Sequence, residues 1–376
     1  MDETPRRSRT SVATDVSGPL DPERELERIS RTSQHKNVQR GLVIQTAFPG
    51  DVILTTPLIR RAAERLGAPV DVVTIPIAAD VLANNPSIRD VIVYDKKGTE
   101  SGLGAAWRLA RRLRARRYHT AFLAQASYRT ALLAWGARIP RRVGFRTSKA
   151  AWLYTHVVFP LGEVHQIERL LALADGAPDR REPEIFPSAG DRDAVDALLA
   201  EAGIRSPFVA LAPGSAWGTK RWPHYPELAR ALAGDVPLAI AGGTGDRADA
   251  RAIRTALGNL PVADGAGRLT LLQSGELIRR AAVLVANDSA PVHLASATRT
   301  PTVEIYGPTV PQFGFAARAL YSRIVEPDPL PCRPCHHHGP AVCPLVHHKC
   351  MRDTPVGAVL AEVRTVLHNV RLRGRG

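Results

Sequence analysis

Residues 41–58 have the sequence GLVIQTAFPGDVILTTPL. The first part, Leu42–Gln45, is a short apolar run of the length expected for a buried strand. Gly50 then allows the backbone to turn tightly. The pair Thr56 and Pro57 predicts a helix over Thr56–Leu66, because proline loses no hydrogen bond at the first helical position. A buried strand followed by a helix is the repeating unit of a parallel α/β sheet.

The same alternation continues through the first half of the chain. Continuous apolar strands separated by helices indicate a parallel sheet that is covered on both faces. The further predicted strands are Val70–Ile75, Val91–Tyr94 and Thr120–Ala124, and the predicted helices between them are Ala78–Asn84 and Leu103–Arg117.

A second α/β unit follows residues 178–187, which are rich in proline and charge, as a linker would be. Its predicted strands are Phe208–Ala212, Pro237–Gly242, Val283–Ala286 and Thr302–Ile305. Its predicted helices are Ala194–Ala202, Tyr225–Ala233, Ala248–Leu257, Gly275–Ala282 and Val292–Ala297. We therefore expect an α/β fold of two facing Rossmann-like domains, with a ligand cleft at the carboxyl ends of their strands.

The expected organisation has three parts. Residues 1–38 are polar and charged, and we expect a disordered leader there. An N-terminal Rossmann-like domain should cover residues 39–182 and a C-terminal one residues 183–376. The second domain includes a segment rich in cysteine and histidine at 332–350 and a final helix at 355–370.

Composition limits the location and the partners of the protein. The 376 residues carry a formal net charge of +14. Such a charge attracts nucleic acid, an anionic membrane surface or phosphorylated substrates. No run approaches the roughly 20 apolar residues that cross a bilayer, and residues 1–30 have no apolar segment of a secretory signal. We therefore expect a cytoplasmic protein.

The first candidate site residue is Asp51, which follows the first predicted strand and lies near a helix start. A carboxylate at the mouth of a cleft can accept a proton from a hydroxyl nucleophile. An acid in the first turn of a helix is also a common structural cap, so both interpretations stay open on the residues alone.

A second candidate site is the loop over residues 211–223, LAPGSAWGTKRWP. It leaves a strand, its small residues can cradle a phosphate, and Lys220 and Arg221 add positive charge toward a leaving diphosphate. It lacks the Gly-Lys-Ser/Thr of a Walker A loop. The alternative is an ordinary loop with two solvated cations.

Two further loops follow strands in the second unit. In residues 285–295, VANDSAPVHLA, a strand delivers Asp288 and Ser289 to the start of a helix, where free N–H groups bind anions. His293 is near enough in sequence to reach the same ligand, although a lone histidine is more often a core residue. In the glycine-rich loop at 241–246, Asp246 could meet a ribose hydroxyl.

All four cysteines lie in one short segment, as Cys332, Cys335, Cys343 and Cys350, with histidines between them. Thiolates and imidazoles are the usual zinc ligands. The sequence therefore predicts a structural zinc site, with an iron–sulfur centre or a cysteine-containing loop without metal as alternatives.

Two charged segments have simpler explanations. The arginine-rich residues 107–117 could bind anionic lipid headgroups or a phosphorylated acceptor, or could form a solvated helix face. Asp191 and Asp193 match the Asp-x-Asp pattern of metal-dependent glycosyltransferases, but they open a predicted helix, where acids favour the helix dipole. We do not count them as a metal site.

Taken together, these residues resemble the ADP-heptose:lipopolysaccharide heptosyltransferases, glycosyltransferase family 9. The resemblance runs from about Gly41 to about Val370. It rests on five motifs in order: FPGDVILTTPL at 48–58, PGS with KRWP within 213–223, NDSAPVHLA at 287–295, YGPT at 306–309 and the CP…CM of 343–351.

The resemblance implies a fold of the GT-B type, metal-independent inverting transfer in lipopolysaccharide biosynthesis, an ADP-heptose donor and a lipid-linked anionic acceptor. We also expect contact with the inner face of the cytoplasmic membrane, and we expect no nucleic-acid partner. It also implies that Asp51 is the general base and that Lys220 stabilises the departing diphosphate. The donor contacts implied are Ser215, Asp246, Asp288, Ser289, Ala290 and His293. Where the family commonly has glycine, this chain has Ala290.

Two other functions remain open on the sequence. One is another nucleotide-sugar transferase or an epimerase of the same fold. The other is a non-catalytic protein whose cysteine-rich segment and positive charge serve metal or nucleic acid. Against the second, the arginines lack the interleaved aromatic residues of single-strand binders.

Overall fold

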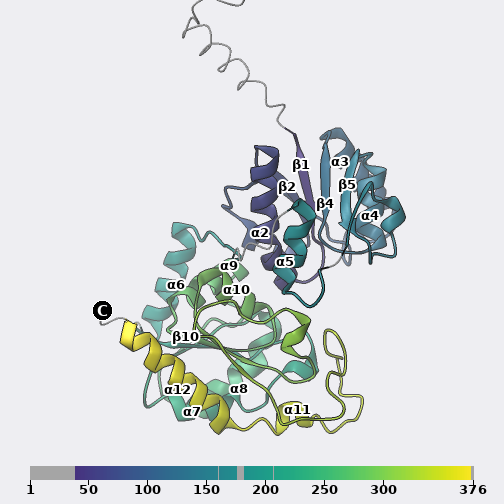
Figure 1. Cartoon of the computed structure of the whole chain (residues 1–376). Helices are drawn as coiled ribbons and strands as arrows, with labels where there is room; N and C mark the ends of the chain where they lie inside the picture. Colours follow the sequence, from purple (N-terminus) through teal and green to yellow (C-terminus); the bar gives the residue numbers. More distant parts are fainter. Residues whose placement is uncertain (1–38, 160, 176–181, 206, 374–376) are drawn as a thin grey trace, which may run out of the picture. The chain divides into compact units, whose positions relative to one another are not determined.

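Two six-stranded sheets, every one of whose strand pairs is parallel, form the frame of the protein (Figure 1). The computed structural model describes residues 39–159, 161–175, 182–205 and 207–373. The predicted leader lies outside the described residues, as do residues 178–181 of the predicted linker. The predicted α/β class with two Rossmann-like parallel sheets is confirmed.

The first sheet has the strand order β3-β2-β1-β4-β5-β6. Its strands are β1 (Gly41–Ile44), β2 (Val70–Thr74), β3 (Ile88–Val93), β4 (Thr120–Leu123), β5 (Arg141–Phe145) and β6 (His156–Val158). The first four were predicted. The last two were not, because they carry arginine, glycine and histidine and lie toward the edge of the sheet, where apolar runs are shorter.

The second sheet repeats the same pattern, in the order β12-β11-β10-β7-β8-β9. Its strands are β7 (Val209–Ala212), β8 (Leu238–Ile240), β9 (Val262–Asp264), β10 (Val283–Asn287), β11 (Thr302–Ile305) and β12 (Arg323–Val325). In both sheets the chain starts in the middle, runs to one edge and then returns to build the other side. The carboxyl ends of the two central strands therefore form the usual ligand position of a doubly wound sheet.

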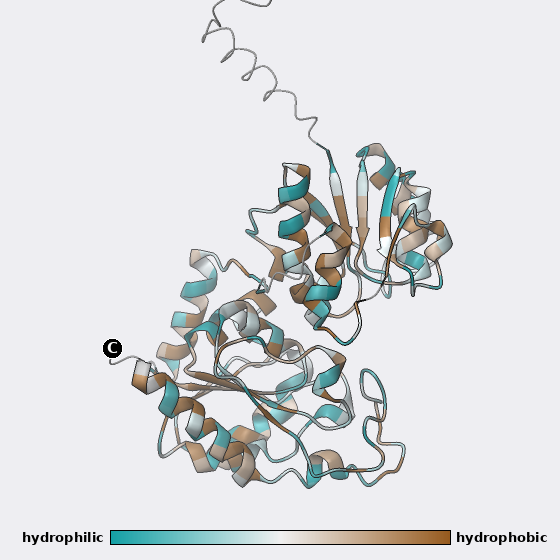
Figure 2. Ribbon diagram, viewed as in Figure 1, coloured by the Kyte–Doolittle hydropathy of each residue, from teal (hydrophilic) through white to brown (hydrophobic). Residues whose placement is uncertain are grey.

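Alternate residues of the central strands enter different apolar clusters. Leu42 and Ile44 of β1 belong to one cluster and Val43 to another. Ala210 and Leu211 of β7 divide in the same way. Since neighbouring side chains on a strand point to opposite faces, both faces of each sheet are buried. Figure 2 shows the strands mostly in brown and the helices in both colours, as expected for helices that cover a sheet.

The helix after β1 begins earlier than the sequence suggested. Helix α2 spans Pro49–Leu66 and contains Pro57 in its interior. The missing N–H of Pro57 would leave the carbonyl of Ile53 without its helical partner, but the Thr56 hydroxyl donates to that carbonyl at 2.8 Å. The predicted helix start at Thr56 was therefore wrong. Thr56 lies inside the helix, where its hydroxyl replaces the hydrogen bond that Pro57 cannot donate.

The remaining helices cover the two sheets. The segment Ala78–Asn84, predicted as one helix, forms two short 3-10 turns, η1 (Pro76–Ala78) and η2 (Asp80–Leu82). The α-helices are α3 (Leu103–Ala115), α4 (Tyr128–Gly136), α5 (Gln166–Leu171), α6 (Ala189–Glu201), α7 (Tyr225–Leu232), α8 (Arg247–Leu257), α9 (Leu271–Arg280), α10 (Ala290–Thr298), α11 (Lys349–Arg352) and α12 (Val356–Arg373). Within the described part of the chain, no helix has both the length and the apolar character needed to cross a membrane.

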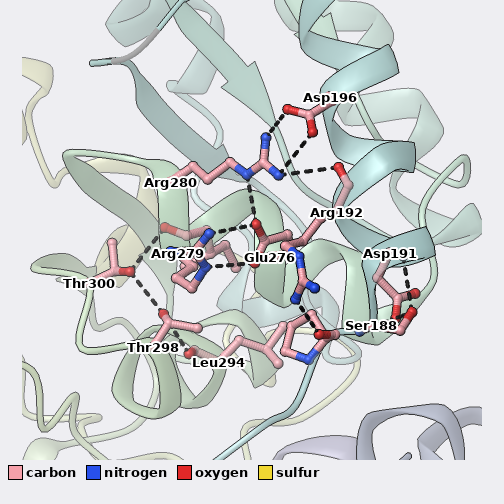
Figure 3. Close-up of polar contacts among 12 residues, drawn as sticks. Ser188, Asp191, Arg192, Asp196, Glu276, Arg279, Arg280, Leu294, Thr298 and Thr300 are labelled. Carbon is pink, nitrogen blue, oxygen red and sulfur yellow. Dashed lines mark hydrogen bonds and ion pairs between the residues drawn. The ribbon is translucent and has the colours of Figure 1, made fainter.

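A buried carboxylate stabilises the end of α9. Glu276 accepts hydrogen bonds of 2.6 and 2.7 Å from Arg279 and another of 2.7 Å from Arg280. Arg280 also pairs with Asp196 of α6, as Figure 3 shows. Burial of Glu276 opposes its ionisation, but the arginine hydrogen bonds outweigh burial and lower its pKa. The network fixes α9 against α6 by charge as well as by apolar contact.

We expect Glu276→Gln to lower the free energy of unfolding by about 2 kcal/mol, the size of a lost charge-assisted hydrogen bond. Urea unfolding measures this value. The matched control is Glu201→Gln, which breaks a solvent-exposed pair with Arg268 and should leave the midpoint unchanged. Equal midpoints for Glu276→Gln and the wild type would contradict a stabilising role.

Candidate active site

The strand order brings two loops of the second half together. Strands β7 and β10 are neighbours, so the loops that leave their carboxyl ends meet. Asn287, the last residue of β10, connects them: its amide donates to the carbonyl of Pro213 at 2.7 Å, and its oxygen accepts the backbone N–H of Trp222 at 3.3 Å. The loop over 213–220 is thereby held against the start of α10.

A buried ion pair lies at this junction. The Nζ atom of Lys220 is 2.5 Å from Oδ2 of Asp288, and the same oxygen accepts the hydroxyl of Thr309 at 2.6 Å. All three side chains are buried. A lysine fixed in this way presents a positive charge that needs little reorganisation to bind an anion.

The start of α10 adds further positive potential. Ser289 is the N-cap residue, yet its side chain makes no capping hydrogen bond and instead donates to the carbonyl of Gly214 at 3.3 Å. Ala290 is the first helical residue. The N–H groups of an uncapped first helical turn favour an anion. The predicted anion-binding residues Lys220, Ser289 and Ala290 are thus brought to one place.

His293 lies on the first turn of α10 and is buried. Burial lowers its pKa to about 4, although Asp288 acts in the opposite direction. The imidazole is therefore neutral near pH 7. Its Nδ1 atom has no hydrogen-bond partner among the described residues, which leaves a buried polar atom available to a ligand.

Asp51 lies in the first turn of α2, and its carboxylate accepts the backbone N–H of Phe48 at 3.2 Å. Burial raises the pKa of Asp51, and backbone hydrogen bonds only partly oppose this. The carboxylate therefore caps its helix, as one interpretation of the sequence expected. A raised pKa also makes it a better proton acceptor.

The Asp51 loop contacts the second half of the chain. A Cβ atom on Gly50 would lie 2.6 Å from Cδ2 of His293, so only glycine permits this approach. The rings of Phe48 and Trp217 have centroids 6.0 Å apart. The first turns of α2 and α10 are thereby neighbours, and the motif around Asp51 adjoins the motif around Asp288.

Arg221 does not extend toward the Lys220 pair. Its guanidinium donates to Asp246 at 2.9 Å and to the Ser215 carbonyl at 3.0 Å, and it also pairs with Asp249. The side chain of Ser215 is buried and accepts the N–H of Trp217. Arg221 therefore supports the loop that carries Lys220, whereas the sequence predicted that Arg221 would contact the diphosphate.

The cysteine- and histidine-rich segment packs against the Lys220 loop, a contact that the sequence did not predict. His348 Nε2 donates to the Thr219 carbonyl at 2.8 Å, and Thr219 in turn donates to the carbonyl of Pro340. A Cβ atom on Gly339 would lie 3.2 Å from Cε of Lys220. This segment therefore forms one wall of the candidate site.

Thr309 is a site residue that was not predicted from the sequence. It lies in the YGPT motif that follows β11, the strand beside β10. A hydroxyl residue after a strand beside a central one is a usable signal, because the carboxyl ends of neighbouring parallel strands share an edge. Its hydrogen bond to Asp288 joins two different loops and therefore has no signal in the local sequence.

The fold and the site define a class of protein. Two parallel Rossmann-like sheets, with a proton acceptor in one half and a buried cation at a helix start in the other, are typical of a glycosyltransferase of the GT-B type. The model of glycosyltransferase family 9 (heptosyltransferase) matches residues 106–341, and the chain belongs to this family. It is an enzyme that transfers a sugar, so the non-catalytic alternative is not favoured.

Relatives support the same assignment. The chain is 29% identical to lipopolysaccharide heptosyltransferase 2 of Salmonella typhimurium over 296 residues, which is 72% of this chain and 84% of that one. It is 28% identical to lipopolysaccharide heptosyltransferase 1 of Pseudomonas aeruginosa, covering 79% and 86% of the two chains. The structure of Escherichia coli ADP-heptose heptosyltransferase II superimposes with a TM-score of 0.73 at 25% identity, over 88% of this chain and 99% of that chain.

The four cysteines remain free thiols in the structure. Burial, helped by neighbouring Cys335 and Cys343, raises the pKa of Cys350 to about 11. Throughout the described residues, no three Cys, His, Asp or Glu side chains are arranged to hold a metal ion. The residues as placed do not form a metal shell, and the structural zinc stays a prediction.

Metal analysis of the purified full-length protein tests that prediction. A zinc site predicts one zinc per chain, lost in Cys332→Ser/Cys335→Ser, because removing two thiolates leaves an incomplete shell. The control His119→Ala/His156→Ala removes two histidines outside the segment and should retain the metal. Wild-type protein without stoichiometric metal would show that no such site exists; stoichiometric iron would favour the iron–sulfur alternative.

Proposed function

We propose that this enzyme transfers a heptose from ADP-heptose to a hydroxyl group of a lipopolysaccharide-core acceptor, with inversion at the anomeric carbon. The names of its relatives support the heptose, the ADP donor and the lipopolysaccharide acceptor. The acceptor would be lipid-linked, and the reaction would take place on the cytoplasmic side of the inner membrane.

The observation that carries the proposal is the contact between the Asp51 loop and the start of α10, through Gly50 with His293. Glycosyl transfer needs a base for the acceptor and a positive charge for the leaving diphosphate. Asp51 would supply the first and Lys220 the second. Their loops are neighbours although the two residues are far apart in sequence.

In the proposed step, the Asp51 carboxylate takes the proton from the acceptor hydroxyl. The acceptor oxygen forms a bond to the anomeric carbon, and the bond from that carbon to the β-phosphate oxygen of ADP breaks. ADP leaves with the electron pair of that bond. The developing negative charge on the diphosphate would be stabilised by Lys220 and by the N–H groups at the start of α10.

The other donor contacts are assigned by their places around this centre. Ser289 and Ala290 would contact the diphosphate through the helix start, and Asp288 would hold Lys220 in position. The neutral imidazole of His293 would contact the donor sugar or phosphate. Ser215 would shape the loop below the phosphates, and Asp246 would accept a ribose hydroxyl while remaining paired with Arg221.

The proposal invokes no catalytic metal ion. The Asp-x-Asp pattern at Asp191 has a structural use, because Asp191 accepts the Ser188 N–H at 2.8 Å and closes a capping box at the start of α6. Asp51 on α2 accepts the Phe48 N–H in the same way, although phenylalanine cannot complete a capping box. The chain therefore offers two capping acids in equivalent positions, of which only Asp51 is proposed to act as a base.

We expect Asp51→Asn to lower kcat for heptose transfer by about 10²- to 10⁴-fold, because asparagine keeps an oxygen for the Phe48 N–H but cannot take a proton. ADP affinity should stay unchanged. Asp191→Asn is the matched control and should be fully active. Because burial raises the pKa of Asp51, kcat/KM should fall on acidification at a higher pH than for an ordinary aspartate. An active Asp51→Asn enzyme would restrict Asp51 to a capping role.

The donor site is tested by calorimetric titration with ADP, UDP and GDP. We expect selective ADP binding that weakens about 30-fold in Lys220→Ala, the effect of losing one charge-assisted hydrogen bond. Lys220→Arg should recover part of the ADP affinity. This variant separates loss of the positive charge from misfolding as the cause of weaker binding. Lys349→Ala, an exposed lysine on α11, is the control. Preferential binding of UDP or GDP would agree with a glycosyltransferase but would exclude ADP-heptose as the donor.

A further inference from the structure

The positive charge of the chain is concentrated in residues 101–161. This segment has 12 lysines and arginines and no aspartate or glutamate. Its charge of +12 leaves only +2 for the other 315 residues. Residues 1–38, with seven basic and seven acidic residues, are neutral overall. Attraction for anions is therefore a property of one part of the first domain.

The same segment exposes large apolar side chains. Tyr128, Leu132 and Trp135 of α4 are all about half exposed, and their spacing of four and three residues puts them on one helix face. Trp107 of α3 is 58% exposed and Trp152 of η3 (Ala151–Leu153) is 75% exposed. Tryptophans are seldom exposed in this number unless they meet a partner.

These side chains come from elements that touch one another. Helices α3 and α4 pack side by side, and η3 packs against α4, as the position of the first two in Figure 1 illustrates. A Cβ atom on Gly136 would lie 3.6 Å from the Trp107 ring, so this ring rests on α4 beside Trp135. Trp107, Leu132, Trp135 and Trp152, with Leu103 and Tyr128, are here called the α3/α4 surface.

Arginines on α3 accompany these apolar groups. Arg108, Arg111 and Arg114 are exposed, and no ion pair to a described carboxylate is found for any of them. Arg112 reaches Glu100 only at 4.0 Å. Arg116, at the end of the helix, differs because Asp71 and Asp90 neutralise it. The arginines nearest the exposed aromatics therefore keep their charge for an external anion.

The α3/α4 surface is connected to the candidate base. The Thr46 hydroxyl donates to the side chain of Gln125 at 2.7 Å, and the Gln125 carbonyl accepts the hydroxyl of Thr130 on the first turn of α4. Thr46 is five residues before Asp51. A partner on the α3/α4 surface would thus lie next to the loop that receives the acceptor.

We propose that the α3/α4 surface docks on an anionic lipid bilayer. Tryptophan and leucine favour the boundary between headgroups and acyl chains, and arginines favour anionic headgroups. Four of these six side chains are aromatic rings close to arginines, so the expectation from the sequence that the arginines lack neighbouring aromatic residues is wrong for this segment. The two exposed leucines, Leu103 and Leu132, favour acyl chains over nucleic-acid bases, which stack on flat rings. The inference rests on the proposed function in one respect: an acceptor embedded in a bilayer explains why the acceptor-side domain carries the surface.

The test is co-sedimentation of the full-length protein with vesicles of equimolar phosphatidylglycerol and phosphatidylcholine, against vesicles of phosphatidylcholine alone. We expect binding to the anionic vesicles only, weakening as salt rises. Arg108→Glu/Arg111→Glu should bind about 30-fold more weakly or worse, and Trp107→Ala/Trp135→Ala about tenfold more weakly. The matched controls are Arg230→Glu/Arg251→Glu and Leu260→Ala/Leu320→Ala, exposed residues of the second domain.

Three outcomes would overturn the docking surface. The wild-type protein does not bind anionic vesicles, the two α3/α4 surface variants bind these vesicles as tightly as the wild type, or the wild-type protein prefers a single-stranded oligonucleotide to vesicles. Failure of the proposed function looks different. ADP titration and transfer to detergent-dispersed acceptor should be normal in all four double variants. If transfer of heptose is absent but vesicle binding follows the α3/α4 surface, the proposed function fails and the surface stands. If heptose transfer occurs but the protein does not bind vesicles, the docking surface fails and the proposed function stands.

Discussion

In a parallel sheet all strands end on the same edge, and this constraint determines where the chemistry of the protein can lie. Both sheets start at a central strand and fill one side before the other. The two loops at each centre diverge from one point and leave room for a ligand. The Asp51 loop follows β1, the Lys220 loop follows β7, and Asp288 follows β10. The site is thus a consequence of strand order, and the side chains only complete it.

Buried charge gives that site its character. Removing Lys220 and Asp288 from water is costly, and their short contact together with the Thr309 hydroxyl offsets the cost. Around this pair, burial favours neutral forms: it lowers the pKa of His293 to about 4 and raises that of Glu304, on β11, to about 8. The Lys220–Asp288 pair carries no net charge, so the Lys220 ammonium group and the N–H groups at the start of α10 would together attract the diphosphate.

The sequence was most informative where period and motif agreed. The apolar strands β1, β2, β7 and β10 could be found because residues buried on both faces form continuous apolar runs. The site motifs could be found because strand ends must carry them. The start of α2 was predicted at Thr56 instead of Pro49. A threonine followed by a proline can begin a helix, but it can also lie inside one when the threonine hydroxyl bonds the carbonyl that the proline leaves free. The role of Arg221 depends on its ion pairs with Asp246 and Asp249. The packing of Gly339 against Lys220 joins residues more than a hundred positions apart. Neither contact can be recognised from the sequence around one residue. The division of the chain near residue 182 and the cysteine metal site stay predictions.

The packing of the last fifty residues has a consequence for dissecting the protein. The family match ends at residue 341, yet Trp222 donates its indole N–H to the Thr354 carbonyl at 3.0 Å, and His348 holds Thr219. Val359 and Val363 of α12 belong to the same apolar cluster as Trp222. A fragment trimmed to the homologous boundary would therefore expose that tryptophan and release the loop that carries Lys220. A fragment that keeps the second sheet folded therefore has to include α12. Cleavage of the chain after Val370 should preserve the fold, whereas cleavage before Thr354 should destroy it.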